Sequence, residues 1–165
     1  MTADVCARLR ELHGDGVEPA AIADLDSDAT AIAVRPEALA HVMRSLRDEA
    51  SLGFEMLLDA SAVDHAPRTP RFELAYQLLS VENDVRVTVR VVLSDDDPRV
   101  DSVSEIWPSA DWFEREIWDL HGLRFIGHPN LERLFLDVSF EGHPLRKDFP
   151  KRGAPLPRSE EGSAG

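Results

Sequence analysis

The chain has 165 residues and a mass of 18.4 kDa, and its 31 acidic and 18 basic side chains give a formal charge of −13 at pH 7. A composition of 43% hydrophobic and 30% charged residues is typical of one soluble globular domain. The negative charge argues against nucleic acid as a partner, and the single cysteine, Cys6, excludes an internal disulfide and a thiolate-held metal cluster supplied by this chain alone.

The first half of the chain predicts a helix, a strand and a second helix. Val5–Leu12 has apolar residues at helical spacing, and Ala29–Val34 is a short strand candidate. Pro36 suits the first turn of the next helix, and Gly53 suits its end. The core stripe of that helix recurs at steps of three and four: Leu39, Val42, Met43 and Leu46.

Three strands are predicted next, over Phe54–Val63, Phe72–Leu79 and Val85–Leu93. The last two alternate apolar and polar residues, and Val81–Asp84 between them is a plausible hairpin turn. Because strands with one apolar face need helices to cover it, we expect an α+β fold over residues 1–106. Its two layers would be helices on a mixed or antiparallel sheet.

A further helix is predicted over Asp111–Leu120, where the charged residues are concentrated. Asp111 is a sensible N-cap, with Glu114 in the capping-box position three residues later. Arg115 and Asp119 have the spacing of a helical ion pair.

Glu116 is the residue of this helix that we expect to be partly desolvated. It lies at the margin of the apolar face, between Leu120 and Trp112 on a helical projection. An unpaired buried carboxylate is costly, so we expect it to meet an arginine, either Arg133 or Arg146 of this chain or an arginine of another chain.

Regular periodicity fades from Gly122 onward, which predicts an extended C-terminal arm. The tripeptide Gly-His-Pro occurs twice in it, at Gly127–Pro129 and Gly142–Pro144, and we expect each histidine to sit in a turn with its ring donating to a backbone carbonyl. The charges between Gly142 and Arg158 sum to +4, which suggests that the arm docks on an acidic or mixed surface. Residues 107–150 would form the motif helix and docking arm, and residues 151–165 a flexible tail.

These motifs resemble the signature of one family, the C subunit of respiratory NADH–quinone oxidoreductase (complex I). Related subunits occur in F420H2 dehydrogenases and membrane-bound hydrogenases, which are the alternative assemblies. His121 stands where the family usually has Phe or Tyr. The matching residues, which the resemblance assigns to the partner interface or to the structural motif, are Glu114, Arg115, Glu116, Asp119, Gly122, Phe125, Gly127, His128, Pro129, Gly142, His143, Pro144, Leu145, Arg146, Lys147 and Asp148.

The resemblance implies a scaffold subunit of a proton-translocating electron-transport complex, without a cofactor or catalytic residue of its own. Iron–sulfur clusters, FMN and quinone would be bound by partner subunits. The chain would dock on the D subunit, which forms the quinone site, with the B and I subunits nearby. It would be peripheral on the cytoplasmic side of the cell membrane, associated with the membrane only through the complex.

Two other classes of protein compete with this interpretation. One is a metal-dependent enzyme that uses His121, His128 and His143, although no His-Glu-x-x-His pattern is present. The other is a free-standing acidic binding module. Elemental analysis would test the first, and co-purification with cluster-bearing partners would test the second.

Overall fold

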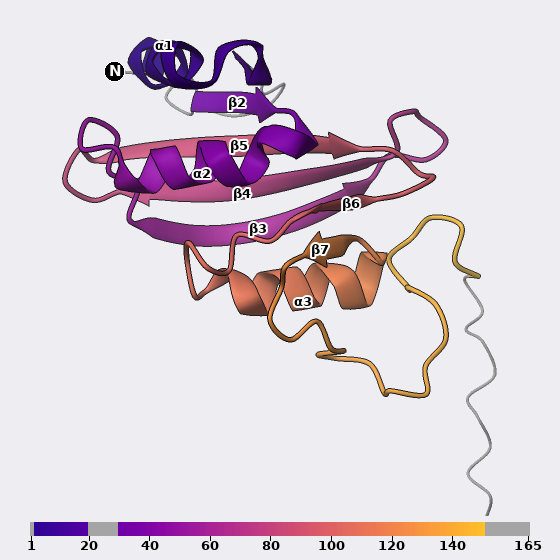
Figure 1. The fold of residues 1–165 in the computed structure, drawn as a ribbon. Helices are drawn as coiled ribbons and strands as arrows, with labels where there is room; N and C mark the ends of the chain where they lie inside the picture. The colour runs from indigo at the N-terminus through magenta and orange to yellow at the C-terminus, as the bar shows by residue number, and fades with distance from the viewer. Residues whose placement is uncertain (1, 20–29, 151–165) are drawn as a thin grey trace, which may run out of the picture.

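A computed structural model describes residues 2–19 and 30–150, which form an α+β fold with a long arm at its C-terminal end (Figure 1). The predicted tail and the first residue of the strand predicted from Ala29 lie outside these described residues. One-turn 3₁₀ helices lie at Gly14–Gly16 and at Pro36–Ala38. The remaining elements are α1 (Thr2–His13), β1 (Val17–Pro19), β2 (Thr30–Val34), α2 (Leu39–Asp48), β3 (Met56–Asp64), β4 (Phe72–Ser80), β5 (Val85–Leu93), β6 (Arg99–Asp101), α3 (Ala110–His121) and β7 (Arg124–Ile126).

The main sheet is mixed, with strand order β1-β2-β5-β4-β3. Only β2 and β5 pair in parallel, through the crossover that contains α2, and the other neighbours are antiparallel. The predicted hairpin is confirmed, with Ser80 opposite Val85 at the turn. Asp84 closes this turn with φ of 50°, a left-handed conformation that Asp tolerates.

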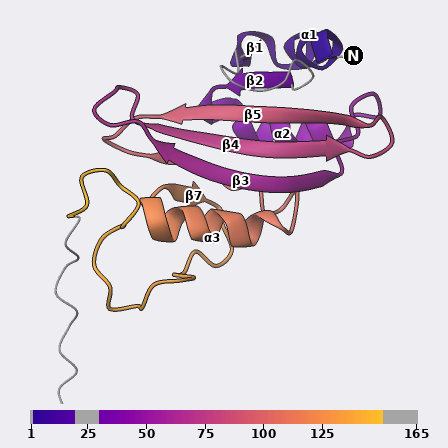
Figure 2. The same cartoon turned by 180° about the vertical axis from the view of Figure 1, so that it is seen from behind.

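The core lies between one face of this sheet and the helices. Along β4, buried residues alternate with half-buried ones, and the buried set is Phe72, Leu74, Tyr76, Leu78 and Ser80. Helix α2 covers β4 and β5 on one side only, as the two opposite views show (Figures 1 and 2). The predicted stripe of α2 is fully buried, which confirms the two-layer α+β prediction.

Two local details differ from the sequence-based expectation. Helix α2 ends at Asp48 rather than near Gly53, because Glu49 turns to an extended conformation with ψ of 120°. The short parallel pair β6–β7 was not predicted, since three-residue strands are too short to show a periodicity. This pair joins the segment before α3 to the segment after it.

Helix α3 lies alongside the edge strand β3, and the arm loops away on the side opposite the sheet before its last described residues return past the end of α3 towards the sheet (Figures 1 and 2). The indole Nε1 of Trp107 donates to the carbonyl of Phe54 at 3.2 Å, which ties the start of this region to the sheet. The motif residues therefore lie at one end of the molecule, around α3.

Candidate functional site: helix α3 and the anchored arm

Of the four carboxylates in α3, two are buried, one is exposed and the fourth, that of Asp111, is half-buried. Glu114 and Asp119 have no exposed surface, whereas Glu116 is exposed. The expectation that Glu116 is desolvated within this chain is therefore wrong, and neither Arg133 nor Arg146 pairs with it; an arginine from another chain stays a prediction. Its helical neighbour Trp112, four residues earlier, is 58% exposed, so this edge of α3 faces away from the sheet.

Glu114 fixes the segment that precedes α3. Its carboxylate accepts the backbone N–H of Val103 at 2.7 Å and the hydroxyl of Ser102 at 2.5 Å. The predicted capping box is wrong, because this side chain reaches outside the helix, and α3 begins one residue earlier, at Ala110, without a side-chain cap. Burial raises the pKa of Glu114 to about 7, and the charge of Asp111 adds a smaller contribution. The two hydrogen bonds act in the opposite direction, because they favour the charged carboxylate.

Asp119 holds the middle of the arm. Its Oδ2 accepts three consecutive backbone N–H groups, from residues 134–136, at 2.8 to 3.0 Å. Its Oδ1 accepts Nη1 of Arg133 at 2.6 Å. Burial acts to raise the pKa of Asp119, but these hydrogen bonds outweigh it and hold the pKa below its ordinary value.

The expected helical pair between Arg115 and Asp119 is also wrong. Arg115 instead donates to the carbonyls of Glu132 and Arg133, at 3.2 and 3.4 Å. The partner of Asp119 is instead Arg133, an arginine from the arm. The guanidinium of Arg133 also donates to the carbonyls of Phe140 and Gly142. Both arginines thus satisfy backbone groups of an arm that has no sheet ladder of its own.

The two Gly-His-Pro histidines behave as predicted, since each ring bonds a backbone carbonyl of α3. His128 bonds the carbonyl of Asp111 through Nε2 at 3.2 Å, and its Nδ1 accepts the N–H of Asn130. His143 bonds the carbonyl of Asp119 through Nδ1 at 2.9 Å. These contacts assign Nε2–H to neutral His128 and Nδ1–H to neutral His143.

The arm packs closely against the C-terminal end of α3. Gly122 is left-handed, with φ of 73°, and a Cβ there would lie 2.5 Å from the His143 ring. Arg146 donates to the carbonyl of His121 at 2.6 Å and, more weakly, to that of Gly122. The N–H of Leu145 bonds the carbonyl of Leu120 at 3.0 Å, so the arm satisfies three successive carbonyls at the helix end.

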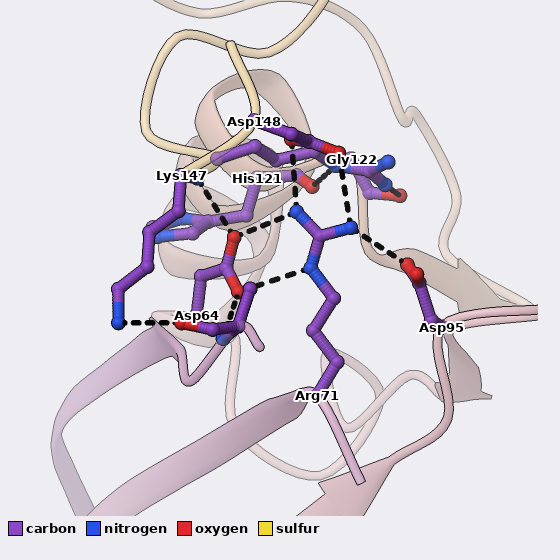
Figure 3. Close-up of polar contacts among 9 residues, drawn as sticks. Asp64, Arg71, Asp95, His121, Gly122, Lys147 and Asp148 are labelled. Atoms are coloured by element: carbon purple, nitrogen blue, oxygen red, sulfur yellow. Dashed lines mark hydrogen bonds and ion pairs between the residues drawn. The ribbon is translucent and has the colours of Figure 1, made fainter. Parts of the chain in front are cut away.

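The far end of the arm is held by a charge cluster that sequence analysis missed (Figure 3). Arg71 is 8% exposed and binds both carboxylate oxygens of Asp64, at 3.0 and 2.8 Å. The same guanidinium contacts Asp148 at 2.8 Å and Asp95 at 2.9 Å. The backbone N–H of Lys147 donates to Asp64 at 2.8 Å, and its ammonium donates to the carbonyl of Ala66 at 3.1 Å.

The electrostatics of this cluster favour its charged state. The hydrogen bonds from Arg71 hold the pKa of Asp64 well below its usual range, against the effect of burial, and raise that of the arginine. Asp64 ends β3 and Arg71 directly precedes β4, so the antiparallel pairing of these strands brings the two side chains together. The sequence signal that could have predicted this ion pair is the opposite charge of the two residues at the adjoining ends of the predicted strands.

The remaining motif residues divide between the core and the surface. Phe125 is buried in β7, and the glycines Gly127 and Gly142 have φ of 79° and 93° in turns. Leu145 is 53% exposed. The two prolines of the repeated tripeptides, Pro129 and Pro144, are exposed and half-buried respectively.

Neither a metal cluster nor a membrane-spanning helix is found within residues 2–19 and 30–150. No group of three or more His, Cys, Asp and Glu side chains in this part is placed to hold a metal ion. None of its helices has the length and apolar character needed to cross a bilayer. A cavity of about 410 Å³ lies apart from the motif residues, lined by Val5, Arg8, Glu49, Ser51, Leu52, Phe54, Asn83 and Val85.

The same α+β fold is found in solved structures of other proteins. A chain in the membrane-bound sulfane sulfur reductase, an archaeal respiratory membrane complex, shares the fold with a TM-score of 0.74 at 24% identity, over 98% of this chain and 96% of that one. A trypsin-resistant fragment of Nqo5 matches with a TM-score of 0.64 at 28% identity, over 79% of this chain and all of the fragment.

Sequence comparison specifies the family. The model of the respiratory-chain NADH dehydrogenase 30 kDa subunit matches residues 32–155. The NADH-quinone oxidoreductase C subunit of Azoarcus sp. (strain BH72) is 45% identical, over 88% of this chain and 74% of that protein. Its counterpart in Ralstonia pickettii (strain 12J) is 54% identical, over 67% of this chain and 59% of that protein. The chain belongs to the family of the 30 kDa subunit, the C subunit of NADH-quinone oxidoreductase, as the motifs predicted.

Proposed function

We propose that the chain is a cofactor-free scaffold subunit of a proton-translocating NADH–quinone oxidoreductase, peripheral on the cytoplasmic side of the membrane. In this proposal the arm within residues 107–150 docks on the quinone-site subunit, with the B and I subunits nearby. FMN, the iron–sulfur clusters and quinone belong to partner subunits. The family supports a place in the complex, and the anchored arm supports the docking role.

One observation carries the docking proposal: the arm is fixed from within by buried charges while bulky apolar side chains remain outside. Asp119 holds the middle of the arm, at residues 133–136, and Arg71 holds its end at Asp148; these two anchors have 0% and 8% of their surface exposed. At or between these anchors, Phe135 is 64% exposed and Val138 is 91% exposed. A rigid irregular segment with exposed apolar groups is suited to binding another protein, because little conformational entropy remains to be lost on docking.

The proposed mechanism is preorganisation. A subunit that holds the quinone pocket and its nearest cluster in register need not itself take part in electron transfer. Displacements of about 1 Å at a reacting centre can reduce a rate by two orders of magnitude. Loss of the arm should therefore lower quinone reduction even where the partner subunits keep their cofactors.

Site-specific photo-crosslinking in the intact complex tests the docking surface. A benzophenone side chain at Val138 should form a crosslink to the quinone-site subunit. The matched control is Val92, which is 48% exposed on the uncovered face of the sheet and should not crosslink to that subunit. A Val138 crosslink to other subunits alone, or equal crosslinking from both positions, would contradict the proposed docking.

Elemental analysis of the purified chain tests the cofactor-free part of the proposal. We expect substoichiometric zinc and iron after chelator-free purification. One equivalent of either metal would contradict it and would favour the alternative in which His121, His128 and His143 serve a metal site.

A further inference from the structure

Several cations of α3 and of the described part of the arm bind groups of this chain itself. Arg115, Arg133 and Arg146 each donate to backbone carbonyls of this chain, and Arg133 also pairs with Asp119. The ammonium of Lys147 bonds the carbonyl of Ala66. Of the cations counted between Gly142 and Arg158, Arg146 and Lys147 therefore bind groups of this chain, and Lys151, Arg152 and Arg158 lie outside the described residues.

The exposed charged residues on the arm between residues 127 and 141 are acidic, as is Glu116 on α3. Glu116 on α3, and Glu132, Asp137 and Glu141 on the arm, are all exposed. Within residues 2–19 and 30–150, the carboxylates of the three glutamates have no hydrogen bond or ion pair. Asp137 accepts the N–H and hydroxyl of Ser139, at 2.8 and 2.6 Å, and still carries its charge.

Large apolar side chains lie among these acids. Trp112 on α3 is 58% exposed, and the guanidinium of Arg115 lies 5.2 Å above its ring while donating to the carbonyls of residues 132 and 133. This arginine therefore joins the tryptophan to the middle of the arm. We define the acidic arm patch as Trp112, Glu116, Glu132, Phe135, Asp137, Val138 and Glu141.

We propose that the acidic arm patch binds a protein surface in which lysines and arginines surround an apolar depression. An aromatic and aliphatic centre with a charged rim is the usual organisation of a specific interface. The rim is acidic, so a basic partner gains attraction, while a second copy of this chain, which carries −13, is repelled. This inference rests on the proposed function and assigns the basic surface to the quinone-site subunit.

Charge reversal tests the sign of the partner surface in the full chain. The variant Glu116→Lys/Glu132→Lys/Glu141→Lys changes the formal charge from −13 to −7. Rim charges act mainly on association, so its association rate constant with a subassembly that contains the quinone-site subunit should fall about tenfold at low salt. At about 0.5 M NaCl the difference from the unmodified chain should shrink, because the charges are then screened.

A matched variant controls for net charge. Glu18→Lys/Asp48→Lys/Glu82→Lys makes the same change at exposed positions on β1, on α2 and in the β4–β5 turn. Its association rate should stay within about twofold of the unmodified chain, as expected for charges outside the interface. Unfolding midpoints equal to that of the unmodified chain would show that both variants fold.

The possible results separate this inference from the proposed function. If the unmodified chain fails to bind the subassembly, the docking on the quinone-site subunit is contradicted. If it binds, and both variants bind at the unmodified rate, docking stands but the basic-surface assignment is overturned. A faster association of the arm-patch variant would show that the partner surface is acidic, and an unmodified chain that dimerises through this patch would also overturn the assignment.

Discussion

Replacing Glu114 by glutamine should make the domain less sensitive to rising pH. The carboxylate is fully buried, and burial raises its pKa to about 7 from an ordinary value of 4.5. Between these two values the folded chain binds a proton that the unfolded chain has released. Protonation therefore favours folding, and the contribution of this group to stability falls as the pH rises through that window.

The magnitude follows from the two pKa values. Raising the pH from 5 to 8 should reduce the free energy of unfolding by between about 2 and 3 kcal/mol through this carboxyl group. Glu114→Gln keeps one oxygen that can accept the Val103 N–H, and its uncharged NH2 group can donate to the Ser102 hydroxyl in place of the second oxygen. The stability difference, variant minus unmodified chain, should therefore grow by that amount between pH 5 and pH 8.

The difference between the two proteins is the quantity to measure, because other groups titrate in the same range. His121 and His143 have pKa values lowered by burial, so they act in the opposite direction and reduce stability as the pH falls. The ionisable groups of Asp111, Tyr76 and His128 lie near the Glu114 carboxylate, and the Nε2 atom of His128 lies 4.0 Å from it. Urea unfolding of both proteins at several pH values isolates the contribution of Glu114. A difference that does not change with pH would refute this account of its protonation.

Two further substitutions test the anchors of the arm. Asp148→Asn should lower the free energy of unfolding by less than about 1 kcal/mol, because this carboxylate is 61% exposed, yet it should speed trypsin cleavage after Lys147. Unchanged cleavage kinetics would contradict the role of Arg71 in holding the arm. Gly122→Ala should cost about 1–2 kcal/mol for its left-handed backbone alone, and the new methyl should also displace the His143 ring. Calorimetry and the imidazole NMR signals of His143 would measure both effects.

The sequence predicted the elements that have strong internal periodicity. The strands β4 and β5, their hairpin and the apolar stripe of α2 agree closely with the structure. Each signal lies within a few residues of chain, where the side-chain period and the turn residues determine the outcome. The family motif is local in the same sense, because it consists of short runs of unusual composition.

The partners of the charged motif residues could not be predicted from local spacing. Glu114 bonds a segment eleven and twelve residues earlier, and Asp119 bonds one up to seventeen residues later. A helical projection identified a partly apolar face but put Glu116, rather than Glu114, at its buried margin. The segment before α3 and the arm determine which side of the helix is covered, and neither has a periodicity from which its position could be inferred.

The contacts also explain why a segment without regular structure carries so many charged residues. A buried or half-buried irregular backbone must find hydrogen-bond partners other than a ladder. Asp119 accepts three consecutive N–H groups, and Arg133 donates to the carbonyls of Phe140 and Gly142 while paired with that carboxylate. A lysine could not replace Arg133 without loss, because a single ammonium lacks the planar, widely spaced donors that reach all these oxygens. The charges of the motif therefore first replace secondary structure within the arm. Within residues 107–150, the exposed carboxylates of Glu116, Glu132 and Glu141 remain available to a partner.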